Sequence, residues 1–242
     1  VAAGPHLYVN YMSGGPSKLF DVAAGKPDKA IEIPPVSSVG QLVAAGDQLL
    51  FENQSFVEPS AWFRYDPATS QVKKTGLFQT APVDFKDVEV IRQTAISKDG
   101  AHVPMTILRR RGTKLDGKNP TLLYAYGGYG ISQTPSFAVR RRLWLERGGV
   151  WVVANLRGGA EFGESWHEEG RLTKKQNVFD DFIACAEFLV KAKYTSPDKL
   201  VIEGRSNGGL LMGAALTQRP DLFRAVVSHV GIYDMLRVET FP

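Results

Sequence analysis

The sequence contains a single cysteine, Cys185, among its 242 residues. One cysteine allows neither an internal disulfide nor a metal site built from several thiolates, and its place in an apolar helical pattern predicts a small buried core residue. Long apolar runs are also lacking, because the longest, such as 149–156, are strand-sized and fall short of the ~18 residues that span a bilayer. We therefore expect a soluble globular protein without a membrane segment, located in the cytoplasm or the periplasm.

Charge of one sign is not in large excess. The 29 Lys and Arg residues against 25 Asp and Glu residues give a formal net charge of +4. Apart from the triplets 109–111 and 140–142, the basic residues are scattered, and no basic stripe alternates with base-stacking aromatics. No Gly-Lys-Ser/Thr phosphate loop is present either. These absences argue against a protein that binds nucleic acid or nucleotides.

Neither end of the sequence has the features of a complete chain. It starts at Val1 without a Met and without the charged and apolar regions of a signal peptide. Residues 239–242 follow soon after an apolar strand, with no closing element. We expect the 242 residues to be a piece of a longer protein.

The first part of the sequence, residues 1–82, reads as short strands separated by Gly, Pro, Asp and Ser. Two similar strand couplets occur, 7–11 with 18–22 and 49–53 with 62–66, and equivalent positions in them are 43 and 45 residues apart. A period of about 40 to 45 residues with several strands per unit is typical of β-propeller blades. Two copies fit an ordinary small β-sandwich almost as well.

Strands and helices alternate in residues 83–242. Asp99 and Gly100 predict a tight turn between strands 88–96 and 102–108. Asn177 is placed to cap the second of the predicted helices. Further strands are expected at 121–126, 149–155, 200–202 and 225–230, and helices at 137–146, 179–190 and 210–219. This order predicts an α/β fold whose mainly parallel sheet is covered by helices on both faces.

The segment Gly204-Arg205-Ser206-Asn207-Gly208 forms a G-x-S-x-G pattern between a predicted buried strand and a predicted helix. A serine on such a sharp strand-to-helix turn leaves no room for Cβ atoms two residues to either side. The turn places the hydroxyl near a helix N-terminus, where backbone N–H groups favour developing negative charge. We therefore expect Ser206 to be a catalytic nucleophile; a structural glycine-rich turn is the alternative.

A base that could activate Ser206 is missing from the sequence pattern. In this fold class the catalytic residues follow the order Ser, Asp or Glu, His. Three of the four histidines, His6, His102 and His167, precede the serine, and His229 comes too soon after it, at the end of the next strand. Asp234 is also too early for the orienting carboxylate. The sequence thus supplies one of three triad members.

Glycine clusters follow two of the predicted strands, at 124–130 and 155–163. The first occupies the place where hydrolases of this class build the second half of the oxyanion hole. A loop turn with core aromatics would explain the same residues.

Together these stretches resemble the prolyl oligopeptidase family of serine peptidases, on its prolyl endopeptidase branch. The matching segments are 115–117, 124–130, 155–163, 165–167, 175–182, 194–197, 206–211, 218–223 and 230–236. The resemblance covers residues 83–242 densely and residues 1–82 loosely. It implies that residues 83–242 are the N-terminal part of an α/β-hydrolase domain and that residues 1–82 are the last blades of a β-propeller that limits access to short peptides.

The resemblance also assigns roles to individual residues. Ser206 matches the nucleophile, and the Tyr126 hydroxyl and the Asn207 backbone N–H match the groups that stabilise the oxyanion. Tyr129, where the family more often has Phe, and Ile232 match positions that line the proline pocket. The triad Asp and His, by the same resemblance, lie beyond residue 242. No metal or organic cofactor is implied.

The expected function is therefore that of a monomeric serine endopeptidase that hydrolyses short proline-containing peptides after proline, through an acyl-enzyme. A polypeptide limited to these 242 residues should show little turnover, because a serine without its base loses several orders of magnitude in rate. Two alternatives stay open: a related hydrolase of other specificity, such as an oligopeptidase B-like enzyme or an esterase, and a non-catalytic interaction module on the same fold.

Overall fold

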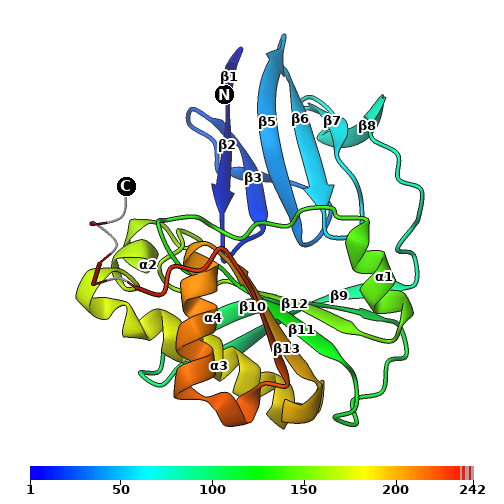
Figure 1. The fold of residues 1–242 in the computed structure, drawn as a ribbon. Helices are drawn as coiled ribbons and strands as arrows, with labels where there is room; N and C mark the ends of the chain where they lie inside the picture. Colours follow the sequence, from blue (N-terminus) through cyan, green and yellow to red (C-terminus); the bar gives the residue numbers. More distant parts are fainter. Residues whose placement is uncertain (235, 238–239, 241–242) are drawn as a thin grey trace. The chain divides into compact units, whose positions relative to one another are not determined.

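The computed structural model describes residues 1–234, 236, 237 and 240 (Figure 1). Met235, in the segment 230–236 that resembles the family, and residues 238, 239, 241 and 242 at the chain end lie outside the described residues. The chain divides into two compact units, one formed by Val1–Lys86 with Thr134–Arg142 and the other by Asp87–Gln133 with Leu143–Pro242. None of the helices formed by the described residues is long and apolar enough to cross a membrane.

The first unit contains two four-stranded antiparallel sheets. One has the order β1 (Ala2–Ala3), β2 (His6–Met12), β3 (Ser17–Ala23), β4 (Lys29–Ile31), and the other β5 (Ser37–Ala45), β6 (Gln48–Ser55), β7 (Ala61–Asp66), β8 (Gln71–Phe78). All neighbours in each sheet follow one another in the sequence, which is a meander. The four strands predicted from the two couplets are confirmed as β2, β3, β6 and β7.

Alternating burial explains why these strands pack together. Along β6 every second side chain is buried, so that Leu49 and Phe51 point into the core while the residues between them are half-exposed. Tyr8 and Tyr65 meet edge to face in the same core, with ring centroids 5.9 Å apart. The Tyr65 hydroxyl donates a hydrogen bond to the buried carboxylate of Asp21 at 3.1 Å, so its polar end does not remain unsatisfied.

The second unit is built on a six-stranded sheet of order β14-β13-β11-β12-β10-β9. Its strands are β9 (Val88–Ile96), β10 (His102–Arg110), β11 (Thr121–Tyr124), β12 (Val150–Ala154), β13 (Leu200–Arg205) and β14 (Ala225–His229). The pairings among β12, β11, β13 and β14 are parallel, whereas β9, β10 and β12 pair antiparallel. The predicted hairpin and the predicted parallel sheet are both confirmed, with the hairpin added at one edge.

Helices of the second unit are α2 (Glu164–Glu168), α3 (Gln176–Lys191) and α4 (Asn207–Gln218), and α1 (Arg140–Glu146) precedes β12. Short 3-10 turns occur at Leu172–Lys174, Pro197–Lys199 and Pro220–Leu222. Helix α3 packs on β9 and β10, and α4 packs on β13 and β14 (Figure 1). Cys185 on α3 is fully buried in this core, as predicted.

Three predicted helix boundaries are wrong by about one turn. Helix α1 begins at Arg140 rather than 137, and α4 begins at Asn207 rather than 210. Asn177 does not cap α3, because the 3-10 turn at Leu172–Lys174 leads directly into the helix and leaves Lys175 at the cap position. The Asn177 side chain instead donates a hydrogen bond to the Glu169 carbonyl at 2.9 Å.

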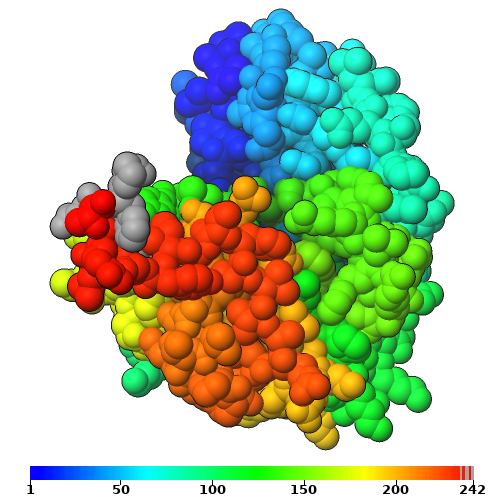
Figure 2. Space-filling model, in the orientation of Figure 1, coloured from blue at the N-terminus to red at the C-terminus, as the bar shows by residue number. Residues whose placement is uncertain are grey.

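The segment after β14 lies over the surface of the second unit beside α4, where Figure 2 shows it in red. Tyr233 packs its ring against Gly213 of α4, since a Cβ on that glycine would lie 2.7 Å from the ring. The Tyr233 hydroxyl also hydrogen-bonds Ser228 at the end of β14.

Candidate active site

Ser206 lies on the turn between β13 and α4, with φ 55° and ψ −115°. This backbone conformation is strained for a residue with a Cβ. Both flanking glycines are required by contact: a Cβ on Gly204 would lie 2.2 Å from the Gly208 carbonyl oxygen, and one on Gly208 would lie 2.8 Å from the Ala125 carbonyl oxygen. The Ser206 N–H donates to the His229 carbonyl at 2.9 Å, which ties the turn to the neighbouring strand.

The Ser206 side chain is half-buried, and no group of the described residues hydrogen-bonds its Oγ. It stands at the N-terminus of α4, whose first N–H groups have no carbonyl one turn earlier within the helix. The Asn207 N–H is the first of these groups. Such a position stabilises negative charge near the serine through both the free N–H groups and the helix dipole.

The loop after β11 is held against this turn by the Asn207 side chain. Asn207 Nδ2 donates to the Tyr126 carbonyl at 2.6 Å. Gly128 passes so close to the same amide that a Cβ there would lie 2.5 Å from Nδ2. A Cβ on Gly208 would lie 3.5 Å from the Tyr126 α-carbon, so the two backbones are also close at this point. Tyr126 itself is half-buried. The structure therefore brings together Ser206, Tyr126 and Asn207, three of the predicted site residues.

The two residues predicted to line a proline pocket have different surroundings. Tyr129 is 71% exposed and has φ 55°, in a tight loop fixed by the Gly130 N–H donating to the Gly158 carbonyl at 2.9 Å. Ile232 is half-buried in the segment after β14. Tyr129 is therefore the more accessible of the two residues.

The second glycine cluster carries a buried ion pair that fixes the end of β12. The Arg157 guanidinium, 4% exposed, donates from Nε to Asp181 Oδ2 at 2.9 Å, and its own backbone N–H donates to the same carboxylate at 3.1 Å. Asp99 from the β9–β10 turn binds the other side of the guanidinium. Burial by itself would lower the pKa of Arg157, but hydrogen bonds and charge from Asp181 and Asp99 outweigh it and raise that pKa above its usual range.

Lys175, which is not among the predicted site residues, lies next to the loop after β11. Its Nζ donates to the Gly127 carbonyl at 2.8 Å and to Asn207 Oδ1 at 3.0 Å. Removal from water lowers its pKa to about 8. The sequence did contain a signal, because no acidic residue lies three or four positions from this lysine at the start of an apolar helix, so no local ion pair accounts for it.

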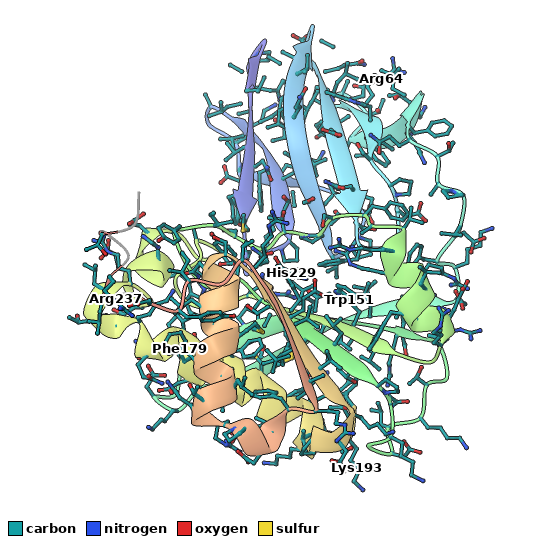
Figure 3. All side chains as sticks on the ribbon, in the orientation of Figure 1. Arg64, Trp151, Phe179, Lys193, His229 and Arg237 are labelled. Atoms are coloured by element: carbon teal, nitrogen blue, oxygen red, sulfur yellow. The ribbon has the colours of Figure 1, made fainter. Side chains whose placement is uncertain are left out.

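The imidazole rings of three of the four histidines have partners other than the Ser206 hydroxyl. His6 pairs with Asp21 at 2.6 Å in the first unit, and His167 Nδ1 lies 3.0 Å from the Gly158 carbonyl. His229, at the end of β14 in Figure 3, faces Glu203 at 3.5 Å. His102 is exposed on β10. Within the described residues, none of the four is hydrogen-bonded to the serine hydroxyl, and no group of three or more His, Cys, Asp or Glu is placed to hold a metal ion.

Comparison with known proteins connects this arrangement to one family. Residues 135–242 match the model of the prolyl oligopeptidase family. The chain is 38% identical over 246 residues to the prolyl endopeptidase of Elizabethkingia miricola, covering 99% of this chain and 34% of that protein. A solved structure from a study of two prolyl endopeptidases and their inter-domain dynamics matches at 41% identity with a TM-score of 0.90, over 100% of this chain and 36% of that one. The chain belongs to the prolyl oligopeptidase family.

This family member spans about a third of the length of the curated relatives it matches. Its structural likeness also extends to oligopeptidase B from Leishmania major, at 31% identity and a TM-score of 0.81, over 94% of this chain and 34% of that one. The family is one of serine peptidases, and relatives with both names match, so the comparisons do not decide between their specificities.

A buried carboxyl lies behind the glycine loops of this prolyl oligopeptidase family member. Glu161 is 1% exposed; its Oε1 accepts hydrogen bonds from the Gln133 N–H at 2.8 Å and from Asn155 Nδ2 at 3.2 Å, while its Oε2 has no partner among the described residues. Burial raises the pKa of Glu161. Asn155 Oδ1 also accepts a hydrogen bond from Arg92 Nη1 at 3.1 Å, which connects Glu161 to this arginine. Burial lowers the pKa of Arg92 to about 10.

Proposed function

We propose that the protein is a serine endopeptidase that hydrolyses short peptides after proline. The observation that carries the proposal is the arrangement of Ser206 on a strained turn at a helix N-terminus, with Tyr126 and the Asn207 N–H beside it. A bare glycine-rich turn has no reason to hold a non-glycine residue at φ 55° between two sterically required glycines. A sharp turn of this kind presents the hydroxyl of a nucleophilic serine to the substrate.

In this mechanism the Ser206 Oγ attacks the carbonyl carbon of the prolyl residue while its proton passes to a general base. The resulting oxyanion accepts hydrogen bonds from the Asn207 N–H and the Tyr126 hydroxyl. Collapse of the tetrahedral intermediate breaks the C–N bond, and the leaving amine takes the proton from the base. Water then hydrolyses the ester on Ser206 by the same steps. The proposal assigns the base and its carboxylate to residues beyond position 242.

Specificity for proline is proposed to come from an apolar slot that includes Tyr129 and Ile232. A prolyl ring is rigid and has no backbone N–H, so a flat apolar surface accommodates it without leaving a donor unsatisfied. Tyr129 is 71% exposed, so its ring can provide such a surface.

The fold supports a further part of the proposal. We assign residues 83–242 to the N-terminal part of an α/β-hydrolase domain and residues 1–82 to the last blades of a β-propeller. Two four-stranded meanders in sequence are what consecutive blades contain. The parallel strands β12, β11, β13 and β14, with the serine after β13, agree with the hydrolase sheet. The proposed protein acts as a monomer on short proline-containing peptides.

The test uses the gene-encoded protein that carries this sequence. We expect it to release the chromophore from a succinyl-Gly-Pro p-nitroanilide substrate, and a fluorophosphonate to label the peptide that contains Ser206. The Ser206→Ala variant should lose turnover by on the order of 10³-fold or more and should not be labelled. Labelling of another serine, or equal turnover by Ser206→Ala, would contradict the proposal.

One alternative function is favoured by a specific observation, the likeness to oligopeptidase B from Leishmania major. Such an enzyme would need acidic residues to bind a basic side chain before the cleaved bond. Comparing kcat/KM for matched substrates that end in Pro or Arg separates the two specificities. If the protein cleaves neither and Ser206 is not labelled, the non-catalytic interaction module becomes the better description.

A further inference from the structure

Lys175 joins two segments of the proposed oxyanion site that are far apart in the sequence. Its ammonium group donates to the Gly127 carbonyl in the loop after β11 and to Asn207 Oδ1 in the first turn of α4. Asn207 in turn donates to the Tyr126 carbonyl at 2.6 Å. Lysine, asparagine and loop therefore form one continuous chain of hydrogen bonds that ends beside Ser206.

The lysine is not part of an ion pair. No carboxylate of the described residues lies within ion-pair distance of its Nζ, and its contacts are the two neutral oxygens above. The adjacent Lys174, by contrast, is half-exposed and pairs with Glu169. Burial of an ammonium group without a counter-ion costs free energy. A surface lysine kept only for solubility would not occupy such a position.

We infer that Lys175 is a positioning residue for the oxyanion site. By holding Asn207 Oδ1 it fixes the rotamer of this side chain, which directs Nδ2 at the Tyr126 carbonyl. By holding the Gly127 carbonyl it fixes the peptide between Gly127 and Gly128, one residue after Tyr126. Together these bonds hold the loop that carries Tyr126 against the turn that carries Ser206 and the Asn207 N–H. Preorganised donors matter most when the oxyanion forms, so the effect belongs to the transition state.

This inference rests on the proposed function, because it needs Ser206 to be a nucleophile. It adds a residue that touches neither substrate nor reacting atoms. Loss of the lysine should therefore reduce kcat without weakening substrate binding, whereas a residue needed only for folding would reduce the fraction of active protein and leave the kcat of the remainder unchanged.

The experiment measures kcat and KM of the gene-encoded protein and its Lys175→Met variant, with active sites counted by fluorophosphonate labelling of Ser206. Methionine keeps most of the side-chain volume and removes the donors. We expect kcat per labelled site to fall about 10-fold or more, because removal of a direct oxyanion donor costs about 10²- to 10³-fold and a displaced one costs less. KM should stay within about 2-fold. Lys174→Met is the matched control and should keep the parent kcat.

A second variant, Asn207→Ala, removes the acceptor for Lys175 and keeps the Asn207 backbone N–H. It should lower kcat to a similar extent, and the double variant should be no worse than the poorer single variant by more than about 3-fold, because both changes break the same chain of bonds. If Lys175→Met does not fold, folded Asn207→Ala decides the question. An unchanged kcat in it overturns the inference.

The outcomes distinguish failure of the role of Lys175 from failure of the proposed function. If the parent protein is labelled at Ser206 and cleaves after proline, but Lys175→Met has the same kcat per site, only the role of Lys175 is overturned. Multiplicative losses in the double variant also overturn it. If the parent protein is neither labelled at Ser206 nor active, the proposed function and this inference fail together.

Discussion

The α-carbon of Gly204 faces the carbonyl of Gly208 so closely that a Cβ on Gly204 would lie 2.2 Å from the Gly208 oxygen. The atom it would meet belongs to the backbone of α4, which cannot rotate away as a side chain can. The turn that presents Ser206 therefore depends on a hydrogen atom in place of a side chain at position 204.

Replacing Gly204 with Ala should lower the free energy of unfolding by about 2 kcal/mol or more, because the helix start must move to relieve the contact. Denaturant titration of the gene-encoded protein measures this change. The matched control is Gly76→Ala on β8, where an added Cβ meets nothing within 4 Å and should change stability by less than about 0.5 kcal/mol. Equal stability of the two variants would show that the turn between β13 and α4 tolerates the side chain.

The strain at Ser206 gives a second prediction. Glycine adopts a positive φ without strain, whereas alanine does not, so the native turn favours Ser206→Gly over Ser206→Ala. Glycine is also more flexible in the unfolded chain, which offsets part of this gain. The net expectation is that Ser206→Gly is more stable by about 1 kcal/mol. Both variants lack the hydroxyl, which makes them a matched pair. Thermal denaturation at one pH compares them; a less stable glycine variant would mean that the turn is not strained at this residue.

Asp181 and Asp99 both bind the Arg157 guanidinium, and we expect their replacement to lower stability by unequal amounts. Asp181 is fully buried, so Asp181→Ala should destabilise the protein by about 3 to 5 kcal/mol, because the buried guanidinium loses its main partner. The Asp99 side chain is 48% exposed, and Asp99→Ala should cost about 1 kcal/mol or less since water can replace it. Unfolding of the two variants in urea provides the measurement. A larger effect at Asp99 would contradict this assignment.

Glu161 predicts a pH dependence of stability. Burial raises its pKa in the folded state, so the contribution of this group is fully present below its ordinary pKa and is lost as the pH rises through the folded value. The stability of the parent protein relative to Glu161→Gln should therefore fall as the pH rises from about 4, the ordinary pKa of a glutamate, into the range of the raised folded-state pKa. Paired denaturation curves across that range test this, and a constant difference would mean that the carboxyl does not titrate there.

The sequence predicts the strands well where local chemistry decides. The hairpin of β9 and β10 follows from Asp99-Gly100 between two apolar runs, and β12 and β13 follow from short apolar segments. Helix starts are harder to predict. Gly208 and Gly209 are poor helix formers, which agrees with a predicted helix start at 210. In the structure α4 begins at Asn207, because these two glycines pack against the loop after β11 and the segment after β14.

Only the site residues within the G-x-S-x-G motif could be predicted from the local sequence. The serine and its glycines form a local pattern, and the resemblance adds Tyr126 and Asn207. The contact between Tyr126 and Asn207 depends on strands β11 and β13 being neighbours, which the order of elements in the sequence does not specify. The contacts of Lys175 depend on the same tertiary arrangement, because its partners Gly127 and Asn207 come from two other segments of the chain. Contacts between distant segments leave no periodic pattern in the sequence.

Strand β14 is the last strand of its sheet, with β13 as its one partner in the part of the chain that the structure describes. Its other side offers backbone donors and acceptors, and Val227 and Val230 near it are 39% and 70% exposed. A row of unpaired backbone groups flanked by apolar side chains is a template for a strand from another molecule. Recombinant production of these 242 residues alone should therefore yield self-associating material unless a further strand or a covering partner occupies that border.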